Sequence, residues 1–216
     1  RTTLTTRTRR IEEIKPSQRK QGRLLVKLED GTILRLSEAE VASFGLRAGM
    51  ELDSGQLEAI QAAVRRSAAR RKAAELAGSR ALSRRELEQK LTRKGLAAED
   101  VQDAADWLED LGAIDDGDYA LLVARHYGAR GYGPGRVRQE LLRRGVPKEF
   151  WEDALEQLPE ARESIDAFLQ KKCGSAAPDE RERKRLCDAL LRRGFSWDQV
   201  RQAMGDGFPD PEDGSM

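Results

Sequence analysis

Apolar residues recur at helical spacing along this chain, and one helical pattern appears three times. Each copy has two apolar residues four positions apart, then two basic residues and a glycine. The copies end at Gly95, Gly145 and Gly194, which stand 50 and 49 residues apart. A glycine behind two cations predicts a helix that ends at a left-handed cap, with the cations at its negative end.

A second amphipathic helix is predicted after each glycine. Its apolar anchors are again four residues apart, and they are Val101 and Ala105, Trp151 and Leu155, and Val200 and Met204. Such a period is typical of tandem arrays in which each small helical unit packs on its neighbours. We therefore predict a mainly α protein with three three-helix repeats in an elongated, curved arrangement. Its function is expected on an extended surface.

Before the repeats, the pattern changes to that of β-strands. Residues 22–28 and 32–36 flank Asp30-Gly31, a pair that accepts the positive φ of a tight hairpin turn. Residues 37–40 fit a capping box that opens a short helix, and residues 46–52 fit another short strand. A small N-terminal segment containing a β-hairpin therefore precedes the helices.

These patterns divide the chain into six segments. The two ends lack apolar periodicity, which is typical of frayed termini. We predict a flexible N-terminus over residues 1–20, a small β-rich segment over 21–55, three-helix repeats over 56–111, 112–158 and 159–205, and a flexible acidic tail over 206–216.

Composition limits the classes of function. Only 38% of the chain is hydrophobic and 36% is charged, which fits several small cores. No apolar run approaches the ~20 residues that cross a bilayer, and the first residues have no apolar signal core, so we expect a cytoplasmic protein without membrane contact. Cys173 and Cys187 have no CxxC partner or nearby histidine, so we expect reduced thiols and no metal site or cofactor.

Catalysis has little support in the sequence. His126 is the only histidine, and it has no nucleophile or carboxylate in a recognisable order. There is no P-loop, and residues 131–135 are better explained as a loop that breaks a helix. Asp115 and Asp116 are paired acids at a helix start, where we favour N-capping over a metal or acid/base role. We therefore expect that this protein is not an enzyme and has no catalytic residues.

The net charge of +1 hides blocks of alternating sign. Residues 56–95 carry eleven bases against four acids, whereas residues 96–118 carry nine acids and no base. The same alternation follows in residues 119–144 and 145–170. The helix before each glycine is thus basic and the helix after it acidic. Two interpretations stay open: a basic edge that binds a partner, or solvated faces whose opposite charges satisfy one another.

Three stretches carry a family resemblance. They are Ala81-Leu-Ser-Arg-Arg-Glu-Leu87 with Lys94-Gly95, Leu111-Gly-Ala-Ile-Asp-Asp116 with Tyr119, and Leu191-Arg-Arg-Gly-Phe-Ser196 with Val200. Through them, residues 74–208 resemble the RecX family of proteins that modulate the RecA recombinase. The resemblance implies tandem three-helix repeats, with the three glycines as caps and Leu87, Leu91, Leu141, Leu190 and Phe195 in the core. It also implies binding in the helical groove of the RecA–DNA filament, with inhibition of ATP hydrolysis, strand exchange and filament extension.

The candidate basic edge for contact with RecA or DNA follows the basic helices. Its residues are Arg65, Arg66, Arg70, Arg71, Arg84, Arg85, Arg93, Lys94, Arg125, Arg130, Arg136, Arg138, Arg143, Arg144, Arg181, Arg185, Arg192 and Arg193. We expect a monomer whose contact with single- or double-stranded DNA is weak or non-specific. Reversing the charges of Arg143 and Arg144 is expected to weaken binding without unfolding the helix.

The alternative is a DNA-binding protein, non-specific or similar to a helix-turn-helix, that acts independently of RecA. The helix after each turn would then read bases. In the first two copies that helix is acidic, so phosphate would repel it. Trp107, Trp151 and Trp197 are candidates for stacking on bases, but each lies near an apolar anchor, so we favour a core position.

Overall fold

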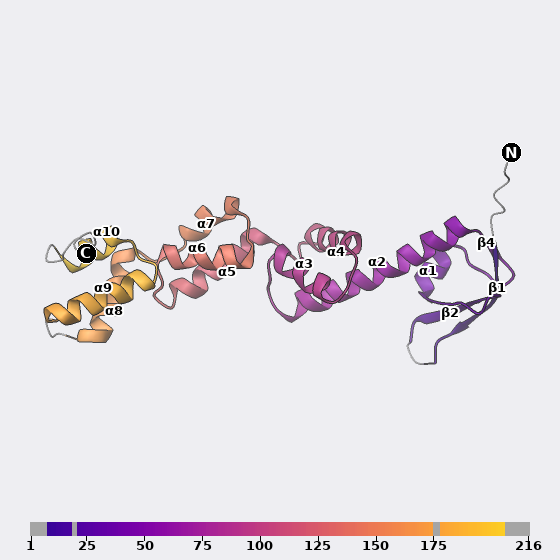
Figure 1. The fold of residues 1–216 in the computed structure, drawn as a ribbon, viewed down its shortest axis with the longest axis horizontal. Coiled ribbons are helices and arrows are strands. Elements are labelled where there is room, and N and C mark those ends of the chain that lie inside the picture. The colour runs from indigo at the N-terminus through magenta and orange to yellow at the C-terminus, as the bar shows by residue number, and fades with distance from the viewer. Residues whose placement is uncertain (1–7, 19–20, 175–177, 206–216) are drawn as a thin grey trace, which may run out of the picture. The chain divides into compact units, whose positions relative to one another are not determined.

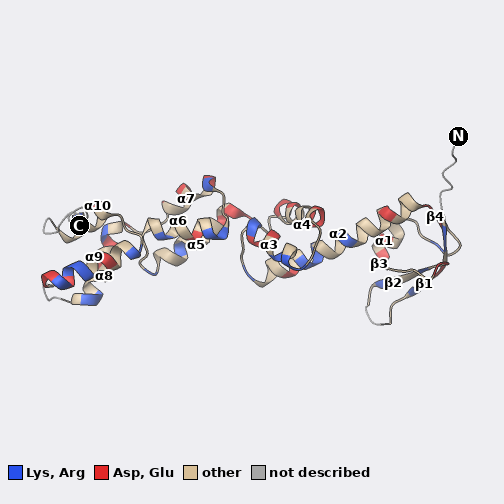
Figure 2. Ribbon diagram, viewed as in Figure 1, with Lys and Arg blue, Asp and Glu red and all other residues tan. Residues whose placement is uncertain are grey.

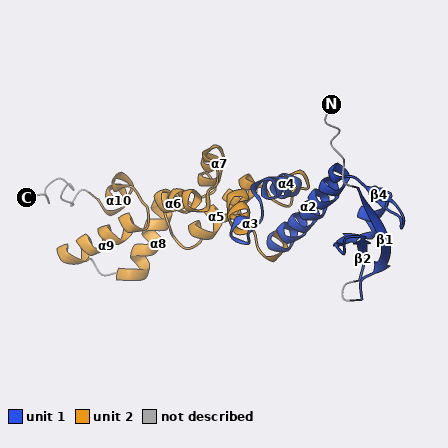
Figure 3. Cartoon of the chain, turned by 45° about the vertical axis from the view of Figure 1, so that its right-hand side comes forward, with its two compact units in different colours: residues 1–76, 91–108 blue, residues 77–90, 109–216 orange. Residues whose placement is uncertain are grey.

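The computed structural model describes residues 8–18, 21–174 and 178–205, and these are mainly helical with a small sheet near the N-terminus (Figure 1). This confirms the predicted fold class. The chain forms two compact units, one of residues 1–76 and 91–108 and the other of residues 77–90 and 109–216 (Figure 3). The predicted tail, residues 206–216, lies outside the described residues. The division into three repeats and their curved arrangement stay predictions.

The sheet of the first unit is antiparallel, with strand order β3-β2-β1-β4. Its strands are β1 (Arg9–Pro16), β2 (Arg23–Leu28), β3 (Ile33–Ser37) and β4 (Glu51–Leu52). The predicted hairpin joins β2 to β3, and Gly31 in its turn has φ of +84°. Ser37 and Glu40 form the predicted capping box of α1 (Glu38–Ser43).

The prediction of a flexible segment over residues 1–20 is wrong for residues 9–16, which form the inner strand β1. The cause is a register shift between Ile11 and Glu13, where β1 pairs with β2. Ile11 and Ile14 are three residues apart and would lie on opposite faces of a regular strand, but the irregularity brings both against the same core. A search for period-two alternation therefore misses this strand.

A long helix completes the core of the sheet. The first part of α2 (Ser54–Ser79) places Leu57 and Ile60 among the buried residues of the sheet, and Val64 packs on the same cluster. The β-rich segment is too small for a core of its own, so this helix supplies the missing apolar face. Next come α3 (Arg84–Arg93), which begins in the second unit and ends in the first, and α4 (Ala98–Asp110).

The second unit contains two further helical cores. The first lies among α5 (Asp116–Gly128), α6 (Pro134–Arg144), the 3-10 turn η1 (Lys148–Phe150) and α7 (Trp151–Leu155). The second lies among α8 (Ala161–Cys173), α9 (Glu180–Arg192) and α10 (Trp197–Met204).

The positions assigned to caps and core are confirmed. Gly95, Gly145 and Gly194 have φ of +79°, +72° and +90°, the left-handed conformation expected after a helix. The five predicted core residues, Leu87, Leu91, Leu141, Leu190 and Phe195, are all at most 4% exposed. The three tryptophans are partly buried, and Trp151 and Trp197 pack against the cores of the second unit.

Candidate interaction surface

In the first unit, arginines of α2 form ion pairs with acids of α4. Figure 2 marks the basic and acidic positions along the two helices. Arg70 donates two hydrogen bonds to Asp103, at 2.7 and 3.0 Å, and its guanidinium lies 5.6 Å from the centre of the Trp107 ring. The other pairs are Arg65 with Asp100 at 3.7 Å and Arg66 with Asp103 at 4.0 Å. These three arginines are therefore partly neutralised within the unit.

In α6, one buried acid gathers three candidate arginines. The side chain of Glu140 is 6% exposed, and its carboxylate lies 3.0 Å from Arg136, 2.6 Å from Arg143 and 3.7 Å from Arg144. Burial opposes the ionisation of Glu140, but the hydrogen bond and charge of Arg143, with the charge of Arg136, hold its pKa below the ordinary value. Arg138 lies apart from this cluster, 3.7 Å from the exposed Glu152.

Arg144 also belongs to a second polar contact. Its guanidinium donates to the Tyr119 hydroxyl, and that hydroxyl donates to Glu86 at 2.8 Å. Burial is the main cause that raises the pKa of Tyr119, and the hydrogen bond with Glu86 adds to it. Arg144 therefore has a structural role, and reversing its charge would disturb the fold as well as the surface.

Arg84 is held at the start of α3. Its side chain donates to Glu88 at 2.8 Å and pairs with Glu109, while its backbone N–H donates to Asp116 at 2.9 Å. Asp115 caps α5 as predicted, through the backbone N–H of Asp118. For Asp116 the prediction needs correction, since its carboxylate caps α3 rather than its own helix. Burial raises the pKa of Asp116, against the hydrogen bond from Arg84.

The ends of α6 and α9, where the cap glycines lie, each contact the start of another helix. The backbone N–H groups of Gly133 and Gly135 donate to the carbonyls of Arg193 and Gly194, both at 2.8 Å. The Ser83 hydroxyl donates in the corresponding way to the carbonyl of Arg144. In each case the start of one basic helix caps the end of the next. The loop at residues 131–135 does break a helix, as predicted, but the sequence reasoning missed this second role.

Arg193 is fixed by the same contact. Its guanidinium donates to the carbonyls of Arg130 and Gly131, both at 3.0 Å, and lies over the rings of Tyr132 and Phe168. The Arg193 guanidinium is therefore held by contacts within the second unit and stabilises its packing.

Half of the candidate basic residues are exposed and have no polar side-chain partner among the described residues. They lie on α2, α3, α5, α9 and the positions that follow α3 and α5, and they are Arg71, Arg85, Arg93, Lys94, Arg125, Arg130, Arg181, Arg185 and Arg192. A guanidinium or ammonium in water is free to meet phosphate or carboxylate. The structure thus separates the candidates into structural arginines and surface cations.

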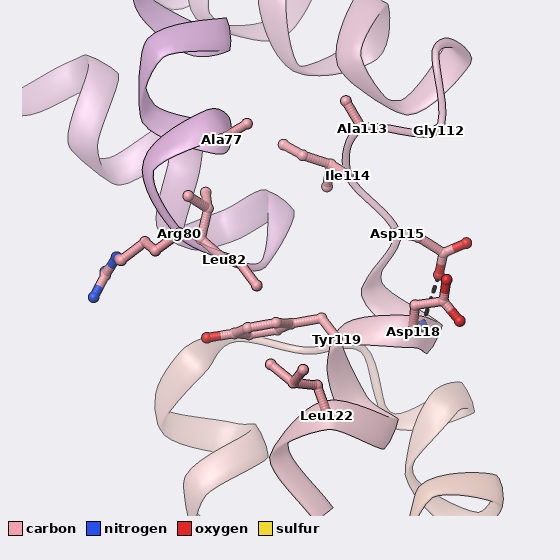
Figure 4. A pocket seen from close by; sticks show the side chains of 11 residues that line it. Ala77, Arg80, Leu82, Gly112, Ala113, Ile114, Asp115, Asp118, Tyr119 and Leu122 are labelled. Carbon is pink, nitrogen blue, oxygen red and sulfur yellow. Dashed lines mark hydrogen bonds between the residues drawn. The ribbon is translucent and has the colours of Figure 1, made fainter. Parts of the chain in front are cut away.

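A groove that the sequence reasoning missed runs along α5 in the second unit. One end is a pocket of about 230 Å³, in which the Tyr119 ring lies between Leu82 and Leu122 (Figure 4). It adjoins a second pocket of about 600 Å³ through shared lining residues that include Arg80 and Leu122. The second pocket is also lined by Arg125, Arg144, His126 and Tyr127. Leu122 is 53% exposed, so an apolar side chain reaches solvent beside these basic residues.

Other sites are not evident in the described residues. His126 is exposed, and its ring meets that of Tyr127 edge to face. Within residues 8–18, 21–174 and 178–205, no three metal-binding side chains lie together as a metal site requires. None of the described helices is long and apolar enough to cross a membrane.

Comparisons with known proteins agree with this architecture. The second three-helix domain of RecX matches residues 115–155, and the third matches residues 160–204. A crystal structure of regulatory protein RecX has a TM-score of 0.74 and 24% identity, covering 91% of this chain and 98% of that one. RecX from Lactobacillus salivarius has a TM-score of 0.60 and 22% identity, covering 66% and 96%. These two likenesses concern the fold.

Curated relatives are more similar in sequence. Regulatory protein RecX of Vibrio vulnificus is 34% identical over 125 residues, which are 56% of this chain and 80% of the relative. Regulatory protein RecX of Halorhodospira halophila is 38% identical over 138 residues, which are 61% of this chain and 83% of the relative. With that identity over most of a relative's length and with two matching domains, the chain belongs to the RecX family of regulatory proteins.

Proposed function

We propose that this regulatory protein binds the RecA–DNA filament in its helical groove and inhibits ATP hydrolysis, strand exchange and filament extension. The observation that carries the proposal is the recurrence, at the first and third repeated helix ends, of exposed cations that have no polar side-chain partner among the described residues. Arg93 and Lys94 are the two basic residues of the first pattern, and Arg192 belongs to the third. Several weak cationic contacts on one chain add in avidity on a repeating target, whereas a free RecA protomer offers fewer.

The proposal needs no catalytic group, metal or cofactor, because steric and electrostatic contact is enough to oppose protomer addition. It places the protein in the cytoplasm, where the chromosome and its filaments lie. A monomer is sufficient, since one chain carries cations on several of its helices.

Sequence-specific DNA binding is the rival function, and the charges disfavour it. Glu99, Asp106, Glu109 and Asp110 are exposed on α4, the helix that would read bases in a helix-turn-helix. The phosphates on either side of a DNA groove would repel this acidic face of α4. Non-specific contact of the surface cations with DNA remains part of the proposal, as a weak component.

The test is DNA-dependent ATP hydrolysis by RecA on single-stranded DNA while this protein is titrated in. Binding to the same DNA without RecA is measured at the same salt, because phosphate contacts depend steeply on salt. We expect inhibition at concentrations well below those that coat bare DNA. Unchanged hydrolysis together with tight, salt-dependent DNA binding would favour the rival.

A further inference from the structure

We propose that the groove along α5 is the contact for RecA itself and takes an acidic segment of the recombinase that carries one bulky apolar side chain. The inference rests on the proposed function, because its occupant belongs to the filament protein. It assigns the protein contact to the groove along α5 rather than to the exposed cations Arg93, Lys94 and Arg192.

The charge of the larger pocket indicates an anionic occupant. Arg80, Arg125 and Arg144 line it, with His126 beside them and no acid among its lining residues. Arg144 is tied to Tyr119 and Glu140, and Arg80 reaches Glu86 only at 3.9 Å. Arg125 is exposed and has no polar partner among the described side chains, so its charge is available to a carboxylate.

The apolar part of the groove indicates a peptide rather than a nucleic acid strand. Single strands bind where bases stack on exposed aromatic faces. Here Tyr119 is 5% exposed, and its ring lies between Leu82 and Leu122 (Figure 4). The exposed His126 and the half-buried Tyr127 also line the larger pocket, but their rings meet edge to face and do not form one flat stacking surface. Leu122 adds an exposed aliphatic side chain. An exposed leucine rimmed by cations fits an apolar side chain flanked by acids.

The smaller pocket adds a second argument against DNA. Asp115 and Asp118 line its far end, opposite the guanidinium of Arg80 (Figure 4). A phosphate backbone is negative along its whole length and would meet these carboxylates. A peptide can place its acids near Arg80 and Arg125 and keep neutral residues at the other end.

The first experiment uses matched substitutions in the full chain. Leu122→Gln and Arg125→Gln alter the groove, while Ile33→Gln and Arg47→Gln alter an exposed aliphatic residue and an exposed arginine of the first unit. Two quantities are measured for the four variants and the wild type: the inhibition of RecA ATP hydrolysis, and the affinity for bare DNA. Thermal melting checks that each variant folds. We expect Leu122→Gln to need a roughly tenfold higher concentration for half inhibition, as for a central interface anchor. Its DNA binding is expected to match that of the wild type.

The second experiment identifies the occupant directly. A photoreactive benzoylphenylalanine replaces Leu122 in one protein and Ile33 in another, and each is irradiated with preformed filament. Cross-links from position 122 to an acid-rich RecA segment, absent from position 33, support the inference. Cross-links from position 122 to DNA, or equal inhibition by wild type and Leu122→Gln, would overturn it. If the wild type neither binds nor inhibits the filament, the proposed function fails first and the groove proposal fails with it.

Discussion

Gly194 lies so close to Arg136 that a Cβ at Gly194 would stand 2.1 Å from the Arg136 amide nitrogen. The Gly194 carbonyl also accepts the N–H of Gly135 at 2.8 Å. The glycine at the end of α9 therefore has two separate requirements: a left-handed backbone and room for the start of α6. Its counterparts share the first requirement but differ in the second. A Cβ at Gly145 would meet the Arg85 side chain, and one at Gly95 would meet nothing within 4 Å.

Alanine at these three glycines should destabilise the protein to different degrees. Gly95→Ala is expected to lose about 1–2 kcal/mol, the cost of a left-handed L-residue. Gly194→Ala adds an overlap with backbone, which costs roughly 1–3 kcal/mol more because backbone cannot move aside as a side chain can. Gly145→Ala should lie between them, since the Arg85 side chain is flexible. Urea unfolding of the three variants measures this order, and equal losses would show that the close approach has no energetic weight.

Glu140 should make stability depend on pH in acid. Its folded pKa is lowered, so the ionised form stabilises the fold above the ordinary glutamate pKa of about 4.3, and this contribution is lost as pH falls toward the folded pKa. Glu140→Gln is expected to lose about 1–3 kcal/mol at pH 7, because its hydrogen bonds are to charged partners.

The difference between the wild type and Glu140→Gln should shrink when unfolding is measured below about pH 4. Glu152→Gln is the matched control, because that side chain is 77% exposed beside Arg138 and should change stability little. A gap between wild type and Glu140→Gln that stays constant from pH 7 to pH 3 would contradict the assignment.

Asp116 should act as a cap for α3 across 32 positions of sequence. Asp116→Ala is expected to lose about 1 kcal/mol, the usual cost of removing an N-cap acceptor. Asp116→Asn should keep most of the stability at pH 7, because its amide oxygen still accepts from Arg84 and burial already disfavours the charged form, as the raised pKa indicates. Thermal melting of the two variants distinguishes the roles; equal losses would mean that the charge, rather than the acceptor, matters.

Local chemistry accounts for the parts of the fold that the sequence predicted. The Asp30-Gly31 turn, the capping box at Ser37 and the glycine after each basic helix are fixed by neighbouring residues. Strand β1 was missed because its register shift breaks the alternation between Ile11 and Ile14. The close approach at Gly133 and Gly135 was missed for a different reason, since their partners lie some sixty residues away.

The same distinction explains the outcome for the candidate surface. The sequence locates basic helices, but it does not say which arginine meets an acid from another turn or helix. Arg70 and Arg143 belong to similar basic runs as Arg71 and Arg192, yet only the first two have ion pairs among the described residues. Leu122 carried no such signal, since it continues an apolar run in the sequence, and only the structure shows it exposed while Ala120, Val123 and Ala124 are buried.

Substituting an arginine that has an ion pair should therefore lower stability, whereas substituting one without a polar partner among the described residues should lower binding. Arg70→Gln removes a two-point hydrogen bond to Asp103 and a contact with Trp107, so it is expected to lower the free energy of unfolding and leave binding largely intact. Arg192→Gln removes a surface cation without a polar partner among the described residues, so stability should change by less than about 0.5 kcal/mol.

For Arg192→Gln the expected loss is in binding. If Arg192 meets phosphate, affinity for the DNA or filament should fall, and the slope of log affinity against log salt should decrease by about one. If it meets a RecA carboxylate instead, affinity for the filament should fall while binding to bare DNA keeps its slope. Fluorescence anisotropy at several salt concentrations, with Arg47→Gln as the exposed control, separates these outcomes. Unchanged binding to both targets would remove Arg192 from the interaction surface and leave the groove at Leu122 as the stronger candidate.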